Sequence, residues 1–159
     1  MNTMHPIRSQ RRRNQSGSAF LEFALVSLIM IPIFFAVIDY SRVFYYGSIV
    51  QGAARAGTQY AAYQAPNHSN TTAVQSAATA DAANVPSAQN FTATATYWCQ
   101  CSNTTPITAS VSCTSTCGSG DSMYVYSQVN TQLTFSTFFQ YPLLPQSITV
   151  TGQSILRVQ

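Results

Sequence analysis

The sequence predicts an α+β protein with a long N-terminal helix, a short second helix and a small antiparallel sheet. Residues 19–38 form an apolar run with a single charge, and small and apolar residues then continue at helical spacing to about residue 64. From residue 91 onward, apolar and polar residues alternate instead. A repeat near 3.6 residues indicates a helix and a repeat of two indicates a strand, so the helices precede the strands.

The first expected element is a helix that crosses a membrane. The run 19–38 has about the 20 residues that a helix needs to cross a hydrocarbon core of roughly 30 Å. It is longer than the apolar part of a signal peptide, which has about 7–15 residues, and no small-x-small cleavage site follows it. We therefore expect a retained single-pass anchor. Four arginines and no acid precede the run, namely Arg8, Arg11, Arg12 and Arg13. This bias predicts a cytoplasmic N-terminus.

The helix is expected to continue beyond the membrane as a stalk, from about Ser18 to about Gln64. At 1.5 Å per residue, such a helix is roughly 70 Å long. The alternative is a span that stops near Tyr46, followed by a separate short helix. Three glycines beyond Tyr46 keep this alternative open, because each weakens a helix by up to about 1 kcal/mol.

The remaining elements follow from turn residues and alternation. A turn cluster at 66–70 precedes an alanine-rich helix at 72–84. Three strands are predicted next, at 91–99, at 123–135 and at about 146–158. An aromatic and proline-rich loop, residues 138–145, separates the last two strands. We expect the sheet to pack on the amphipathic half of the long helix.

The four cysteines of the chain lie in its strand-rich part: Cys99, Cys101, Cys113 and Cys117. An even number in an exported segment predicts two disulfides. A Cys99–Cys101 bridge would be strained, because Cα atoms two apart on a strand are roughly 6.5–7 Å apart. We expect the nested pairing, Cys99 with Cys117 and Cys101 with Cys113, because it closes a hairpin. Zinc is the alternative, although it favours Cys-x2-Cys pairs or nearby histidines.

Charge and composition exclude several functions. Without residues 1–17, the chain has three arginines, four acids and no lysine, which gives a net charge of −1. This balance argues against nucleic-acid binding. The exported part offers His68, Asp81 and Asp121, with no second histidine or lysine to activate a nucleophile. We therefore expect no enzymatic activity, no cofactor, no metal and no small-molecule substrate.

A small-residue break and a lone carboxylate mark the start of the apolar run. Glu22 is the only charge in the run, and a carboxylate at mid-bilayer costs about 2.5–3.5 kcal/mol. Gly17 and Ser18, followed by Glu22 and Phe23 after an arginine-rich leader, resemble the processing site of type IV prepilins and pseudopilins. In those proteins, prepilin peptidase cuts after the glycine. The alternative is a carboxylate that stays hydrated or protonated near the interface.

The sequence that follows extends this resemblance. EFALVSLIMIPIFFAVIDYSRVFYYGSIVQGAARAGTQYAA is similar to the TadE-like family of minor pseudopilins from tight-adherence pilus systems. Asp39 and Arg42 bracket the helix exit, and Arg55 lies in the stretch that corresponds to the family's AAREGAR. Ala56 replaces the family's usual acid after this arginine, so the resemblance carries no local ion pair to this position. The resemblance implies a pilin-like fold.

The resemblance also implies an organisation and a set of partners. We expect a basic cytoplasmic leader at 1–17, a transmembrane and stalk helix at 18–64 and an exported domain at 65–159. The expected location is the bacterial inner membrane, with the C-terminal domain outside the cytoplasm. A protein anchored in this way is also able to enter the pilus. The expected partners are the membrane, prepilin peptidase, other pilins and pseudopilins, and the inner-membrane assembly platform.

Two functions therefore remain. The first is a minor pseudopilin that is processed after Gly17 and acts in pilus assembly or secretion, where Glu22 pairs with the new α-amine on Ser18 of a neighbouring subunit. The second is an uncleaved single-span membrane protein with an extracellular, disulfide-stapled binding module. After the leader, four sequons have the form of N-glycosylation acceptors and favour the second function, at Asn67, Asn70, Asn90 and Asn103.

Overall fold

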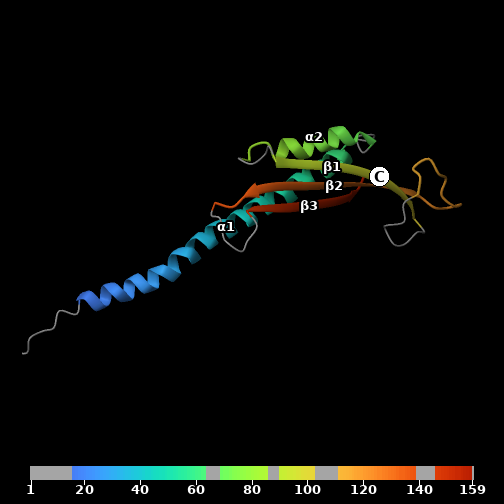
Figure 1. Cartoon of the computed structure of the whole chain (residues 1–159). Coiled ribbons are helices and arrows are strands. Elements are labelled where there is room, and N and C mark those ends of the chain that lie inside the picture. Colours follow the sequence, from blue (N-terminus) through green and yellow to red (C-terminus); the bar gives the residue numbers. More distant parts are fainter. Residues whose placement is uncertain (1–15, 64–68, 86–89, 103–110, 139–145, 159) are drawn as a thin grey trace, which may run out of the picture. The chain divides into compact units, whose positions relative to one another are not determined.

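The computed structural model describes residues 16–63, 69–85, 90–102, 111–138 and 146–158. Within these ranges, the chain forms two helices and three strands: α1 (Ser16–Tyr63), α2 (Thr71–Asp81), β1 (Phe91–Cys101), β2 (Met123–Ser136) and β3 (Ser147–Arg157) (Figure 1). The predicted α+β arrangement is confirmed. The chain divides into two compact units, one up to Ile38 and the other from Asp39 onward, and α1 has residues in both.

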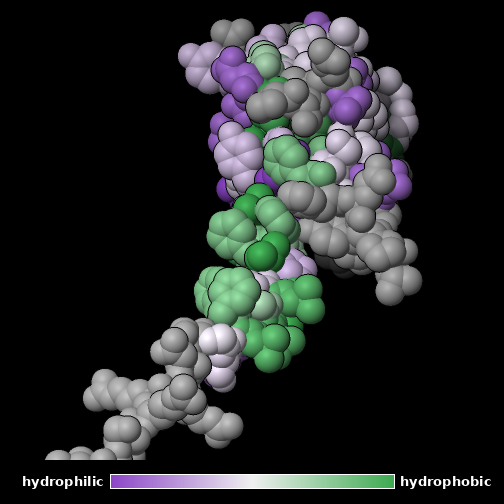
Figure 2. Space-filling model, turned by 60° about the vertical axis from the view of Figure 1, so that its left-hand side comes forward, coloured by the Kyte–Doolittle hydropathy of each residue, from purple (hydrophilic) through white to green (hydrophobic). Residues whose placement is uncertain are grey.

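Helix α1 is a single helix of 48 residues, so the alternative of a break near Tyr46 is wrong. In the first unit its side chains are mostly exposed, and Figure 2 shows their apolar character. By length and composition this helix is able to cross a membrane, and none of its most apolar 18-residue window is buried inside the protein. Exposed apolar surface of this extent marks a region that contacts lipid or other proteins.

Helix α2 begins where a polar side chain caps it. The Asn70 side chain accepts a hydrogen bond from the Ala73 backbone N–H at 3.1 Å, which satisfies one of the first free N–H groups of the helix. The helix ends at Asp81, three residues before the predicted end at Asn84, and residues 82–84 form a turn. The prediction ran longer because alanine favours a helix. In the structure, the backbone N–H of Ala82 bonds the Ala80 carbonyl oxygen instead, which closes a tighter turn and ends the helix.

The sheet is antiparallel, with β2 between β1 and β3. The β1–β2 register runs from Phe91 opposite Leu133 to Cys101 opposite Met123, so the first strand is two residues longer than predicted. Alternate residues of β2 are buried, as expected for a strand with one covered face. The predicted loop 138–145 lies outside the described residues except for Phe138.

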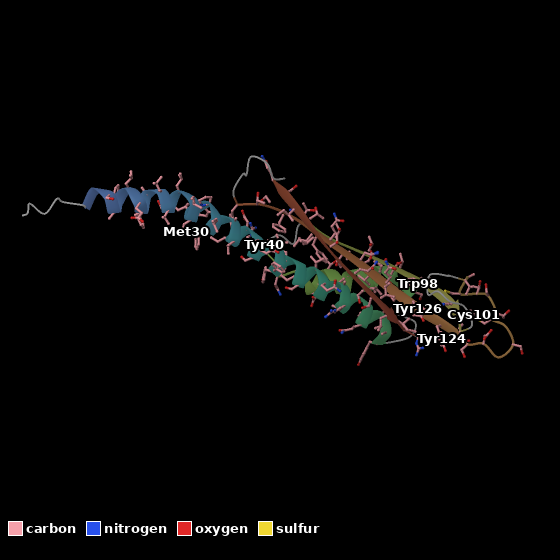
Figure 3. The ribbon with its side chains drawn as sticks, turned by 90° about the horizontal axis from the view of Figure 1, so that it is seen from below. Met30, Tyr40, Trp98, Cys101, Tyr124 and Tyr126 are labelled. Atoms are coloured by element: carbon pink, nitrogen blue, oxygen red, sulfur yellow. A yellow bond between two sulfur atoms is a disulfide. The ribbon has the colours of Figure 1, made fainter. Side chains whose placement is uncertain are left out.

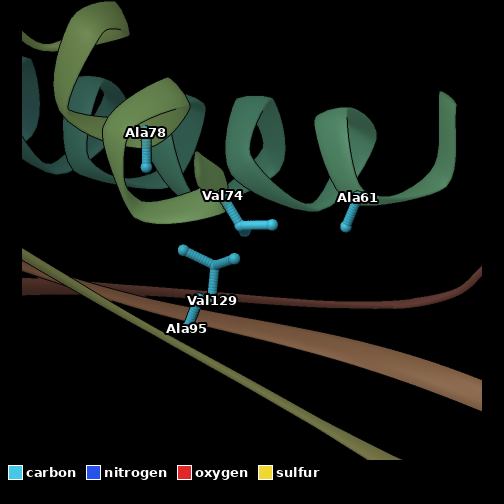
Figure 4. Close-up of a cluster of buried hydrophobic side chains, with 5 residues drawn as sticks. All are labelled: Ala61, Val74, Ala78, Ala95 and Val129. Carbon is cyan, nitrogen blue, oxygen red and sulfur yellow. The ribbon is translucent and has the colours of Figure 1, made fainter. Parts of the chain in front are cut away.

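Two apolar clusters fill the space between the sheet and the helices of the second unit. Figure 4 shows the first cluster, which joins α1, α2, β1 and β2 through small side chains: Ala61, Val74, Ala78, Ala95 and Val129. The second joins α1 to β2 through Tyr46, Val50, Leu133 and Phe135. Both helices therefore pack on the same face of the sheet, and the predicted packing of the sheet on the second half of α1 is confirmed.

Two glycines set how closely the helices and the sheet approach. A Cβ at Gly57 of α1 would lie 3.1 Å from Val129 and 3.2 Å from the Cβ of Ala78. A Cβ at Gly152 of β3 would lie 2.8 Å from the Val50 carbonyl group of α1. Helix backbone thus meets strand backbone directly at Gly152. In the sequence, Gly57 was one of the glycines that weaken a continuous helix. In the structure, its lack of a side chain allows α1 to pack closely against β2 and α2.

Polar side chains complete the contact between α1 and the sheet. Buried Thr131 donates from Oγ1 to the Val50 carbonyl oxygen at 2.8 Å. The Gln51 amide donates to the Gln153 carbonyl oxygen at 2.9 Å and accepts from the Gln153 N–H at 3.4 Å. Gln51 thereby satisfies both backbone groups of an edge-strand residue, which protects this part of the edge from pairing with another chain.

Candidate functional site

The predicted processing site lies in the first turns of α1. Gly17, Ser18 and Glu22 are exposed, and a Cβ built at Gly17 meets no atom within 4 Å. The large apolar side chains around the carboxylate, Phe20, Leu21 and Phe23, are exposed as well. These residues are therefore accessible to another protein or to lipid, because the described part of the chain does not cover them.

The predicted helix-exit charges Asp39 and Arg42 form an ion pair at the start of the second unit. Arg42 Nη1 lies 3.6 Å from Asp39 Oδ1, one helical turn away. Asp39 is only 7% exposed, and its Oδ1 also accepts a hydrogen bond from the Phe138 N–H at 3.1 Å. Arg42 in turn donates to the Ser136 carbonyl oxygen at 3.2 Å. A buried carboxylate is tolerated when it is paired and hydrogen-bonded in this way.

Arg42 also contacts three aromatic rings. Its guanidinium carbon lies 4.1 Å from the ring centroid of Phe138, 5.3 Å from that of Phe135 and 5.6 Å from that of Tyr46. Cation–π contacts of this kind contribute about 0.5–2 kcal/mol each. The pair Asp39–Arg42 therefore fastens the end of β2 to the first turns of α1 in this unit. Two of these rings, Phe135 and Phe138, lie more than 90 residues from Arg42 along the chain, which is why the sequence alone did not indicate these contacts.

Arg55 is not part of this arrangement. It lies 13 residues after Arg42 on the same helix, a rise of about 20 Å, and its side chain is exposed. The three predicted helix-exit charges thus divide into a bonded pair and a separate surface arginine.

The four predicted disulfide cysteines are all paired, but the nested pairing is wrong. The bonds are Cys99–Cys113 and Cys101–Cys117, with Cα–Cα distances of 5.1 and 5.6 Å. Both distances lie within the usual range for disulfides. Among the described residues, no group of three or more His, Cys, Asp or Glu side chains is placed to hold a metal ion.

The return of the chain to β1 explains the observed connectivity. Val111 lies beside β1 in an isolated antiparallel bridge, and its N–H donates to the Cys99 carbonyl oxygen at 2.8 Å. Cys113 follows two residues later and so reaches Cys99 first. A turn closed by the bond from Ser115 N–H to the Ser112 carbonyl oxygen then redirects the chain, and Cys117 reaches Cys101. A nested hairpin would need Cys117 beside Cys99, where Cys113 is bonded.

A shallow groove of about 460 Å³ on the sheet was not indicated by the sequence. The side chain of Asn130 accepts from the amides of Gln128 and Gln153, at 3.1 and 2.9 Å, on this surface. On β1 and β2, the rings of Trp98 and Tyr126 stack with their centroids 5.8 Å apart. Figure 3 labels both residues. The residues that line the groove are all neutral: Thr92, Thr94, Asn130, Thr131, Gln132, Thr151, Gly152 and Gln153. Such a lining offers hydrogen bonds but no acid, base or strong nucleophile.

Part of the chain matches a known protein family. Residues 17–65 match the model of the TadE-like protein family, which is not an enzyme family. Comparison with curated proteins and with solved structures gave no match. The matched segment begins at Gly17 and contains the exposed apolar part of α1 together with Asp39, Arg42 and Arg55. Residues 17–65, about a third of the chain, are therefore similar to TadE-like proteins, and this segment contains the candidate membrane helix.

Proposed function

We propose that this protein is a membrane-anchored minor pseudopilin of a tight-adherence pilus, processed by prepilin peptidase and acting in pilus assembly or secretion. The observation that carries the proposal is the extent of the family match, which starts at Gly17 and covers the whole apolar run. The exposure of Gly17 and Ser18 in the first turns of α1 supports the processing step. The peptidase would then have access to the Gly17–Ser18 bond at the membrane surface.

Cleavage has a physical consequence for assembly. It creates an α-amine on Ser18, with a pKa near 8, four residues before the Glu22 carboxylate. When apolar helices pack against each other away from water, Glu22 of one subunit and this amine of the next neutralise each other. The exposed apolar side chains along the first unit supply the remaining contact surface.

The proposed topology has a cytoplasmic leader at 1–17, a transmembrane and stalk helix at 18–64 and an exported domain at 65–159. The arginines before the apolar run support a cytoplasmic N-terminus in the bacterial inner membrane. The two disulfides support an oxidising environment for the C-terminal domain. Other pilins and pseudopilins and the inner-membrane assembly platform are the proposed partners.

Sequencing the N-terminus of the protein purified from membranes of a host that encodes the pilus system tests this function. We expect a mature chain that begins at Ser18. Replacing Gly17 with leucine should leave the leader attached and the protein in the membrane but outside pilus complexes. Gly47→Leu is a matched control, because no atom lies within 4 Å of a Cβ at this position either, and its leader should be removed normally. A wild-type chain that keeps its leader would favour the uncleaved single-span protein instead.

A further inference from the structure

Exposed aromatic side chains gather around the first turns of α1 in the second unit. Tyr40, Phe44, Tyr45 and Phe138 are each between 58% and 67% exposed. Tyr40 and Phe44 contact each other edge to face at 4.9 Å. The apolar run ends at Ile38, directly before this group. We name these four residues the aromatic girdle.

Phe138 is fixed in the girdle although it follows β2. Its N–H donates to Asp39 Oδ1 at 3.1 Å, and its ring lies under the Arg42 guanidinium at 4.1 Å. Two independent contacts thus place a residue that follows β2 beside the first turns of α1 in the second unit. Asp39 and Arg42 therefore position this ring. They leave its outer surface exposed.

The girdle surrounds the helix at one level. At 3.6 residues per turn, Tyr40, Phe44 and Tyr45 point about 100°, 140° and 240° away from Asp39. Phe138 occupies the remaining direction, because it contacts Asp39 and Arg42. A docking patch for a protein would gather its aromatic residues on one side. Aromatic side chains on all sides at one level indicate a planar surface perpendicular to the helix.

A membrane–water interface is a surface of this kind. From Asp39 to Tyr45, six residues further along, the helix rises by about 9 Å. One headgroup region is roughly 5–8 Å thick, the difference between the full bilayer and its hydrocarbon core. Tyrosine is enriched at this depth, where the ring contacts lipid and the hydroxyl contacts water. The girdle also adjoins the candidate membrane span without a gap in the sequence.

We propose that the aromatic girdle lies in the headgroup region of the membrane, so that Phe138 anchors the sheet of the second unit to the lipid surface. This inference depends on the membrane anchor of the proposed function. It adds that the folded unit, and not only the helix, contacts lipid. The depth of the helix is then set by contacts on two segments that are far apart in the sequence.

Quenching of tryptophan fluorescence by brominated lipids tests this placement. The full chain carries Trp98→Phe and one new tryptophan, and is reconstituted in phosphatidylethanolamine–phosphatidylglycerol vesicles with bromine at either a shallow or a deep position. Phe138→Trp retains an aromatic ring under Arg42. Tyr63→Trp is the matched control, because Tyr63 is an 83% exposed aromatic residue about 35 Å further along α1. Phe34→Trp, in the apolar run, reports on the span itself.

We expect the shallow bromine to quench Phe138→Trp most strongly, the deep bromine to quench Phe34→Trp, and neither to quench Tyr63→Trp. If Phe138→Trp behaves like Tyr63→Trp while Phe34→Trp is quenched, the girdle is not at the interface although the anchor stands. If Phe34→Trp is not quenched either, the anchor and the girdle are both wrong. Intact disulfides and an unchanged circular-dichroism spectrum, checked in each variant, ensure that folded protein is compared.

Discussion

Single residues decide how closely α1 and the sheet approach each other. Gly152 is the clearest example, because the nearest atoms to its missing Cβ belong to the helix backbone at Val50, which has no rotamer to change. In the sequence, Gly152 is simply a glycine within a predicted strand, for which a bulge or a close approach is the usual explanation. The contact with Val50 arises only when segments 102 residues apart meet.

Gly152→Ala should destabilise the second unit. The new methyl group would lie 2.8 Å from the Val50 carbonyl group, so either the helix or the strand must move. Overpacking of this kind costs about 1–3 kcal/mol, and the thermal unfolding temperature of the purified protein should fall accordingly. Gly47→Ala is the control: no atom lies within 4 Å of its Cβ, and alanine favours the helix by up to about 1 kcal/mol. Equal melting temperatures for Gly152→Ala and wild type would show that the backbones are not in contact.

At the scale of elements, periodicity predicted the type and order of every helix and strand within the described residues. Helix α1 and the buried face of β2 both follow from patterns within one segment. The path between β1 and β2 was not predictable in this way. It depends on where Val111 returns to β1, and nothing in a local pattern specifies that register.

The disulfide pairing can be tested with paired substitutions. Cys99→Ser with Cys113→Ser removes one observed bond and should leave Cys101 and Cys117 joined, with no free thiol by mass spectrometry. Cys99→Ser with Cys117→Ser removes one partner of each bond and should leave two reactive thiols, on Cys101 and Cys113. Loss of one bond closing a loop of about 15 residues should lower stability by about 3 kcal/mol. Two free thiols in the first variant and none in the second would instead support the nested pairing.

At the scale of the whole molecule, α1 has two different roles along its length. Up to Ile38 its apolar side chains are exposed, whereas from Asp39 onward it is the helix against which the sheet packs. An exposed apolar surface of this size in water would favour association, so the first unit needs lipid or neighbouring helices. Glu22 is the carboxylate within that surface. Changing it tests whether the first unit acts in assembly or only as a membrane anchor.

Substitution of Glu22 should separate these two roles. Glu22→Gln keeps the size of the side chain and its ability to form hydrogen bonds, but removes the charge that we propose pairs with a neighbour's α-amine. We expect this variant to be inserted and cut at least in part after Gly17, yet lost from assembled pilus complexes. Glu22→Leu removes the insertion cost of about 2.5–3.5 kcal/mol and should anchor the monomer at least as well. Co-purification of Glu22→Leu with pilus partners at the wild-type level would show that the carboxylate has no role in assembly.

The sequence by itself determined the fold class, the apolar helix, the four disulfide-forming cysteines and the TadE-like segment. Each of these depends on residue type and spacing within one stretch of chain, where side-chain chemistry and backbone period act locally. Only the tertiary structure decided the pairing of Cys99 with Cys113, the backbone contact at Gly152 and the place of Phe138 beside Asp39 and Arg42. These contacts join residues that are distant in the sequence, so their geometry exists only once the sheet has packed on α1.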